Sequence, residues 1–243
     1  MKVLGYIMLH YGLEYLEYVI KAIDPFCDKI MIFYTEKPSH QLVYGAKCPE
    51  SKEQLRELAL SSSGKVEWRE VNLIGERRHR QQVFRFKAGY DLILNVDSDE
   101  VWDQDHLDQA ITDASNTDSR FIGIDGFVHF YRSFNWEVKD YFRPIRFHNL
   151  KSIKNDVKEI KGRIYHFGYV QNIDIFNYKM SIHGHRKEIP QNWIVDKYIN
   201  FDPLTTEKIH PCSETIWMKA EPFDKTTLPE MLKKHPYYNS EKV

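Results

Sequence analysis

The chain has 243 residues, 42% of them hydrophobic and 28% charged, and its formal net charge of -1 excludes a strong overall attraction to nucleic acid or acidic membranes. Its three cysteines are widely spaced and contain no CxxC pair, which argues against a disulfide framework. No apolar span is long enough to cross a bilayer, and the apolar run 3–9 is too short for a signal peptide, so we expect a cytoplasmic protein.

Strand and helix patterns alternate over the first 115 residues. We predict strands over 2–10, 29–34, 66–71 and 92–96, and helices over 13–23, 51–60, 76–88 and from 103 to about 114. Ser51 with Gln54 forms a capping box, and Asp103 stands where an N-cap is expected. Such alternation predicts an α/β fold with a Rossmann-type, mostly parallel central sheet flanked by helices.

The pattern changes after Arg120. We predict β-strands over 121–131, 141–147 and 163–169, while repeated prolines beyond Lys187 exclude long regular elements. We therefore expect one domain over 1–243, with an α/β half to about 115, a mixed α+β half over about 116–200 and an irregular C-terminal tail over about 201–243. No GxGxxG motif follows the first strand and no Walker-type loop is present, which argues against a Rossmann dehydrogenase or a P-loop enzyme.

An acidic cluster, Asp97-Ser98-Asp99-Glu100, directly follows the apolar strand 92–96. Carboxylates this close repel one another, so they need either full solvent exposure or a bound cation. Ligands of open α/β sheets bind at the carboxyl ends of the strands, and residues i and i+2 of an extended segment point to the same side. This placement favours a metal site over the alternative, a solvated loop before the Asp103 cap.

Two segments resemble the GT-A glycosyltransferases, family 2-like. The stretch from Gly75 to Glu100 is similar to the arginine-bearing helix, glycine turn and Asp-x-Asp strand end of those enzymes, and 164–169 with Lys179 and His183 is similar to a later segment. The resemblance implies transfer of a sugar from a nucleotide-sugar, UDP-linked, to an acceptor hydroxyl, with Mn²⁺ or Mg²⁺ as cofactor. It also implies that the first half binds the nucleotide and that the second half binds the acceptor and completes the metal site.

The same resemblance implies roles for individual residues. Asp99 is the expected metal ligand and Asp97 the next, while a late histidine completes the metal site. His183 and His185 would lie on one side of an extended segment, with His166 as a further candidate. Arg77 and Arg80 share a helix face that would reach the donor. Strand-end topology alone, rather than the resemblance, places His10, Tyr11 and Glu36 near the nucleoside. The donor-binding residues expected in all are His10, Tyr11, Glu36, Arg77, Arg80, Asp97, Ser98 and Arg186.

The carboxylate that deprotonates the acceptor is less well marked. Glu159 and Asp156 precede the His-aromatic-Gly segment and are the expected catalytic residues. Lys158 stands where such enzymes often have a histidine, so the match is poor. Asp125 and Glu137 are alternatives in the same half.

Other functions stay open. One is a metal-dependent nucleotidyltransferase, although this chain has no glycine-rich phosphate loop, and another is a non-catalytic module that binds sugar or nucleotide. The acceptor of a glycosyltransferase could be a glycan, a lipid-linked sugar or a protein. It could also be a modified DNA base, for which the local basic patch would be Arg143, Arg146, Lys151, Lys154, Lys158 and Lys161.

Overall fold

A computed structural model describes residues 1–38, 47–72, 75–241 and 243. The chain divides into two compact units, the first built from 1–41, 50–127 and 142–164, and the second from 42–49, 128–141 and 165–243. Two long strands, β6 (Ser119–Tyr131) and β9 (Lys154–Tyr169), run from the first unit into the second. Within the part of the chain that is described, no helix combines the length and the apolar character needed to cross a bilayer.

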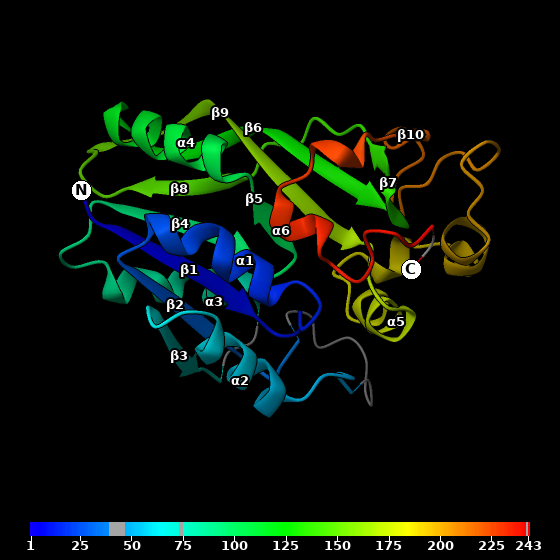
Figure 1. Ribbon diagram of the computed structural model, residues 1–243, viewed down its shortest axis with the longest axis horizontal. Helices are drawn as coiled ribbons and strands as arrows, with labels where there is room; N and C mark the ends of the chain where they lie inside the picture. Colours follow the sequence, from blue (N-terminus) through cyan, green and yellow to red (C-terminus); the bar gives the residue numbers. More distant parts are fainter. Residues whose placement is uncertain (39–46, 73–74, 242) are drawn as a thin grey trace. The chain divides into compact units, whose positions relative to one another are not determined.

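The first unit contains the elements that the sequence predicts in alternation (Figure 1). Its strands are β1 (Val3–Leu9), β2 (Lys29–Tyr34), β3 (Val66–Glu70), β4 (Leu92–Asp97), β5 (Glu100–Trp102) and β8 (Ile145–Asn149). Its helices are α1 (Leu16–Ile23), α2 (Lys52–Ser62), α3 (Glu76–Arg80) and α4 (Gln104–Asn116), with 3₁₀ turns η1 (Asp24–Phe26) and η2 (Gln81–Phe86).

The sheet of the first unit has a parallel centre and an antiparallel margin. β3, β2, β1 and β4 lie side by side in that order, and all their pairings are parallel. β8 then pairs antiparallel with β4, and the first part of β6 pairs antiparallel with β8. The predicted fold class is therefore confirmed: an α/β arrangement with parallel central strands flanked by helices.

Alternating side chains of the central strands pack against helices on opposite faces. On one face α1 and the turn after it lie so close to β1 that a Cβ on Gly5 would come within 3.4 Å of Ile23 Cδ1, at the end of α1, and within 2.9 Å of Cys27 Sγ. On the other face Leu4, Tyr6 and Ile93 form an apolar cluster with Val83 of η2. Figure 1 shows α1 and α2 in front of these strands and α3 behind them. Burial on both faces explains why the strand 92–96 reads as a continuous apolar run.

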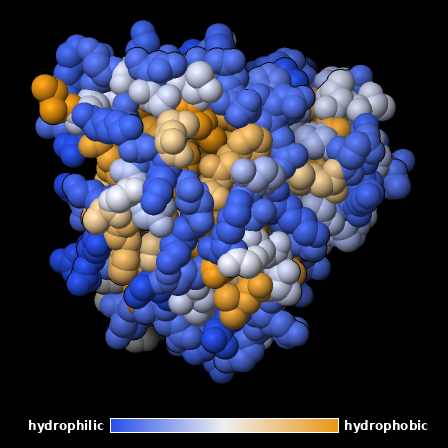
Figure 2. Space-filling model, turned by 60° about the vertical axis from the view of Figure 1, so that its left-hand side comes forward, coloured by the Kyte–Doolittle hydropathy of each residue, from blue (hydrophilic) through white to orange (hydrophobic). Residues whose placement is uncertain are grey.

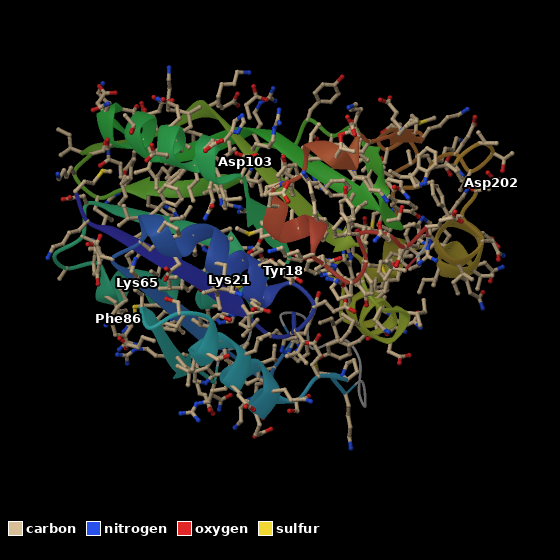
Figure 3. All side chains as sticks on the ribbon, in the orientation of Figure 1. Tyr18, Lys21, Lys65, Phe86, Asp103 and Asp202 are labelled. Carbon is tan, nitrogen blue, oxygen red and sulfur yellow. The ribbon has the colours of Figure 1, made fainter. Side chains whose placement is uncertain are left out.

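Local capping signals place two helix starts where they were predicted. The Ser51 hydroxyl accepts a hydrogen bond from the Gln54 amide at 3.1 Å, and the Asp103 carboxylate accepts one from the His106 amide at 3.2 Å. Asp103 is labelled in Figure 3, at the start of α4. The helix predicted over 76–88 is wrong beyond Arg80, because the chain tightens there into the 3₁₀ turn η2. Its β-branched and aromatic side chains are poor helix formers, and Val83 is instead buried against the sheet.

The second unit has its own aromatic core. Its elements are β7 (Ser133–Val138), α5 (Ile173–Ser181), η3 (Arg186–Glu188), the π-helix η4 (Ile194–Ile199), β10 (Ala220–Pro222), η5 (Lys225–Thr227) and α6 (Glu230–Lys233). The core of this unit is made of Tyr131, Val138, Tyr169, Phe176, Met180, Trp193, Tyr198, Phe201, Ile209, Trp217 and Ala220. The elements after Lys187 are short, as the prolines predict. The surface in Figure 2 is largely hydrophilic, with apolar groups between the polar ones.

The strand β7 and the helix α5 were not predicted. β6 turns into β7 at Arg132, which has a φ of 62°. This left-handed conformation is usual for glycine or asparagine, so an arginine there gives no turn signal in the sequence. The strand predicted over 141–147 is confirmed only from Ile145 onward, as β8.

Candidate functional site

The ends of β1 and β4 form a topological switch point. From β1 the chain builds β2 and β3 to one side, and it then returns to place β4 on the other side of β1. Because the connections leave in opposite directions, a crevice opens at the carboxyl ends of these two strands, where open α/β sheets bind ligands. His10 and Tyr11 follow β1, and Asp97 is the last residue of β4.

A tight contact joins the two strand ends. The Ser98 hydroxyl donates a hydrogen bond to the Tyr11 carbonyl at 2.9 Å. Gly12 has a φ of 142°, and a Cβ there would lie 2.8 Å from the Ser98 side chain, so only glycine allows this approach. The Glu50 carboxylate accepts hydrogen bonds from the amides of Gly12 at 2.6 Å and Leu13 at 3.1 Å. The loop after β1 is therefore held directly against the acidic cluster.

Two arginines compensate the acidic cluster. Arg146 Nη2 lies 3.0 Å from Asp97 Oδ2, and its guanidinium also makes two contacts with the Glu100 carboxylate, one of them from Nε at 2.8 Å. Arg80 Nη2 donates to the same Asp97 oxygen at 3.1 Å, and Arg80 Nε donates to Glu76 at 2.7 Å. Asp97 thus bridges two guanidinium groups that come from α3 and β8.

Burial controls the protonation of this network. Burial raises the pKa of Glu100 to about 7, although the Arg146 guanidinium acts against it. Burial by itself lowers the pKa of Arg146 and of Arg80, but the carboxylates of Glu100, Asp97 and Glu76 raise both above the ordinary arginine value. Both guanidinium groups therefore stay charged at neutral pH.

This arrangement changes the argument for a metal ion. The sequence suggested that solvent exposure or a bound cation would make the clustered carboxylates tolerable. In the structure, arginine side chains from distant segments stabilise Asp97 and Glu100 instead. The chain also turns at Ser98 and Asp99, so the extended geometry expected to bring Asp97 and Asp99 onto one ion is not present. No group of three or more His, Cys, Asp or Glu side chains within the described residues is arranged to hold a metal ion. Asp99 is buried at this turn, and the predicted roles of Asp97 and Asp99 as metal ligands stay predictions.

The residues predicted to contact the donor lie in several places. His10 Nδ1 is 2.7 Å from the Thr35 carbonyl, and burial lowers the pKa of its ring. Glu36 is exposed beside Lys52, and Arg77 is exposed on α3. A hollow of about 440 Å³ follows the ends of β2 and β3, lined by Tyr34, Thr35, Glu36, Lys37, Lys52, Glu70, Val71 and Asn72.

The late histidines belong to the second unit. His183 and His185 lie in the turn after α5 rather than on an extended segment, and their rings are 5.8 Å apart. His185 Nδ1 is 2.8 Å from the Glu188 carboxylate, and Arg186 is exposed in η3. Their predicted roles as metal ligands and as a donor-binding arginine stay predictions.

The predicted catalytic carboxylates lie on the surface part of β9. Asp156 and Glu159 are exposed, and Glu159 forms an ion pair with Arg143 at 3.1 Å. Their predicted role as the acceptor base stays a prediction.

The basic patch predicted for a DNA acceptor is mostly paired with carboxylates, and the DNA acceptor stays a prediction. Arg146 is buried in the strand-end network. Four other members are each paired with a carboxylate: Arg143 with Glu159, Lys151 with Asp91, Lys154 with Asp118 and Lys161 with Asp125. A patch neutralised in this way offers little attraction to phosphates.

Sequence reasoning missed Arg146 as part of the site, and it missed a histidine pair in the second unit. His129 is buried, and its Nδ1 lies 3.0 Å from Nδ1 of His166. Trp217 Nε1 donates to Asp140 at 2.7 Å, and the same carboxylate oxygen is 3.7 Å from His129 Nε2. These residues are far apart in the sequence, so no local pattern connects them.

No protein-family model and no curated protein sequence matches the chain. Several solved structures are similar to it. Glucosyl-3-phosphoglycerate synthase from Mycobacterium tuberculosis, in complex with Mg²⁺ and uridine diphosphate, is 14% identical with a TM-score of 0.38 over 54% of this chain. TarS from S. aureus is 13% identical with a TM-score of 0.43 over 83% of this chain. The matches span 44% and 43% of the length of those two proteins.

A third similar structure is that of an enzyme of a different class. The 4-diphosphocytidyl-2C-methyl-D-erythritol synthase from Anaerococcus prevotii is 9% identical with a TM-score of 0.43, over 76% of this chain and 96% of its own length.

Proposed function

We propose that the protein is a glycosyltransferase that takes a sugar from a UDP-linked donor with the help of Mn²⁺ or Mg²⁺. One observation carries the proposal: the Asp-x-Asp segment lies at the switch point of the parallel sheet and is hydrogen-bonded to the end of β1 through Ser98 and Tyr11. A nucleotide bound there contacts the ends of three neighbouring strands.

In the proposed complex the nucleoside lies along the ends of β1 and β2. His10, Tyr11 and Thr35 line this edge, and the hollow beside Thr35 and Glu36 takes the base. Asp97, held by its two arginines, accepts hydrogen bonds from the ribose. Its orientation is set before the donor arrives, which lowers the entropy cost of binding.

Asp99 is the proposed protein ligand of the cation. Mg²⁺ is commonly bound by one or two carboxylates together with substrate phosphates, so a single aspartate is sufficient once the diphosphate is present. The cation supplies positive charge to the leaving diphosphate. Metal binding should therefore depend on the nucleotide, and the nucleotide on the metal.

Calorimetric titration of UDP with Mn²⁺, and again with a chelator, tests the proposal. We expect binding that requires the cation and that weakens at least about tenfold in Asp99→Asn, since one charged ligand is lost. The matched control is Asp105→Asn, which removes an exposed carboxylate from the first turn of α4. Absence of UDP binding would overturn the proposal, and so would equal binding by both variants.

Activity needs a separate test. Slow hydrolysis of UDP-sugars in the absence of an acceptor is expected, because water replaces the acceptor hydroxyl. Release of pyrophosphate from a nucleoside triphosphate would instead identify a nucleotidyltransferase.

A further inference from the structure

A cavity of about 660 Å³ lies between the sheet of the first unit and the segment formed by α3 and η2. The strands contribute Tyr6, Ile93, Asn95, Phe121, Ile145 and His148 to its wall. Val83 and Phe84 of η2 close the opposite side. This segment is the α3 helix up to Arg80 and the 3₁₀ turn η2 after it. The volume is that of a site for a small organic molecule.

One polar atom in this wall has no partner. His148 Nδ1 is buried and accepts or donates no hydrogen bond among the described residues. The His148 ring is held edge-on by Phe84 and Phe121, with ring centroids 5.0 and 5.5 Å away. Burial lowers the pKa of His148 to about 4, so the ring is neutral at pH 7. A buried polar atom left in this way is costly unless a bound molecule satisfies it.

The wall also includes one arginine, Arg77, that forms no ion pair among the described residues. Arg77 is exposed and has no carboxylate partner among the described residues, whereas Arg80, on the same side, is taken by Asp97 and Glu76. The cavity thus combines an apolar interior, one unsatisfied imidazole nitrogen and one available guanidinium group.

We infer that this cavity binds a small amphiphile: a flat apolar body between Phe84 and Ile93, a polar group that reaches His148, and an anionic group that pairs with Arg77. Arg77 then serves this ligand rather than the nucleotide-sugar. The inference does not require the proposed transferase activity, because no donor contact is used in it.

Titration with 1-anilinonaphthalene-8-sulfonate tests the inference, since this probe has two aromatic groups and one sulfonate. We expect saturable fluorescence enhancement with one site per chain. Ile145→Trp should weaken it at least about tenfold, because the indole occupies the cavity. The matched control is Ile153→Trp, at a residue whose surface is 94% exposed, and it should leave binding unchanged.

The anionic contact has its own pair of variants. Arg77→Gln should weaken the probe about fivefold, the size of one exposed ion pair, while Arg78→Gln, at an exposed neighbour outside the cavity wall, should not. Both variants change exposed side chains, so their probe affinities still test the inference if Ile145→Trp fails to fold. Equal affinity of Arg77→Gln and Arg78→Gln overturns the inference. Displacement of the probe by UDP also overturns it, because the cavity would then be part of the donor site.

Discussion

Charged pairs in the first unit occur in two surroundings. At the end of β4, Arg146 and Glu100 have side chains only 6% and 2% exposed. Along β9, Arg143 and Glu159 are 36% and 58% exposed, at a similar separation. Loss of one partner should therefore cost more folding stability at the end of β4 than along β9. A buried charge that loses its partner cannot be hydrated, whereas an exposed charge can.

The largest effect is expected from Arg146→Ala. This change leaves Glu100 and Asp97 buried or half-buried without their shared guanidinium, and removal of one partner of a buried pair costs about 3–5 kcal/mol. Urea unfolding followed by circular dichroism measures it. A loss below about 1 kcal/mol would show that the strand end is hydrated and that the comparison with β9 fails. The double variant Arg146→Met with Glu100→Leu should recover much of the lost unfolding free energy, because Glu100 no longer leaves a buried charge without a partner.

The next effect is a pH dependence due to Glu100. Its pKa is raised by burial to about 7 in the folded protein, so between its ordinary value of 4.5 and 7 the folded state holds a proton that the unfolded state has released. Stability from this group is therefore full below pH 4.5 and is lost as the pH rises through 7, by roughly 3–4 kcal/mol at 1.36 kcal/mol per pKa unit. Unfolding free energies of the wild type and Glu100→Gln from pH 4.5 to 8 isolate this group. A difference that does not change with pH contradicts the prediction.

A smaller effect is expected from Arg80→Ala. Arg80 and Asp97 are 29% and 24% exposed, so water partly replaces the lost contact, and we expect a destabilisation of about 1–2 kcal/mol. Thermal unfolding measures it, with Arg78→Ala on the same helix as the control. If both variants melt together, Arg146 alone is enough to compensate Asp97.

The smallest effect is expected from Arg143→Ala. Its pairs with Glu159 and Asp125 are exposed, so the loss should stay below about 1 kcal/mol and shrink further in 1 M salt. The midpoints of urea unfolding of the wild type and Arg143→Ala, at low and at high salt, measure this loss and its salt dependence. A loss as large as that of Arg146→Ala would remove the distinction between the two regions.

Much of the α/β half was predictable because its signals are local. Ser51 and Asp103 cap the helices they precede, and the apolar run 92–96 becomes the buried strand β4. Alternation predicted that Asp97 follows a buried strand, whereas its position beside the end of β1 comes from the observed strand order. The break of the predicted helix after Arg80 depends instead on how Val83 packs against the sheet, which is a tertiary effect.

The charge balance of the site was not predictable, because Arg146 lies 49 residues from Asp97 in the sequence. It comes from β8, an antiparallel strand whose pairing with β4 has no local signal. As a lone arginine in the sequence it looked like part of a surface patch. The repulsion among the carboxylates of 97–100 correctly indicated that their negative charge must be compensated. It did not indicate whether a metal cation or an arginine side chain provides the positive charge.

The strand order has a consequence for how the protein folds. β1 meets β2 after a short connection, whereas Val3 pairs with Leu92 only after a long loop has closed. Closing long loops costs more entropy, so we expect the β1–β2 pair to form first and β4 to dock late. Pulsed hydrogen exchange should then show early protection at Asp28, whose amide donates to the Val3 carbonyl, and late protection at Leu92, whose amide donates to the Lys2 carbonyl. The reverse order would refute this. A nascent chain would therefore complete the crevice at the ends of β1 and β4 only after the β1–β2 pair has formed.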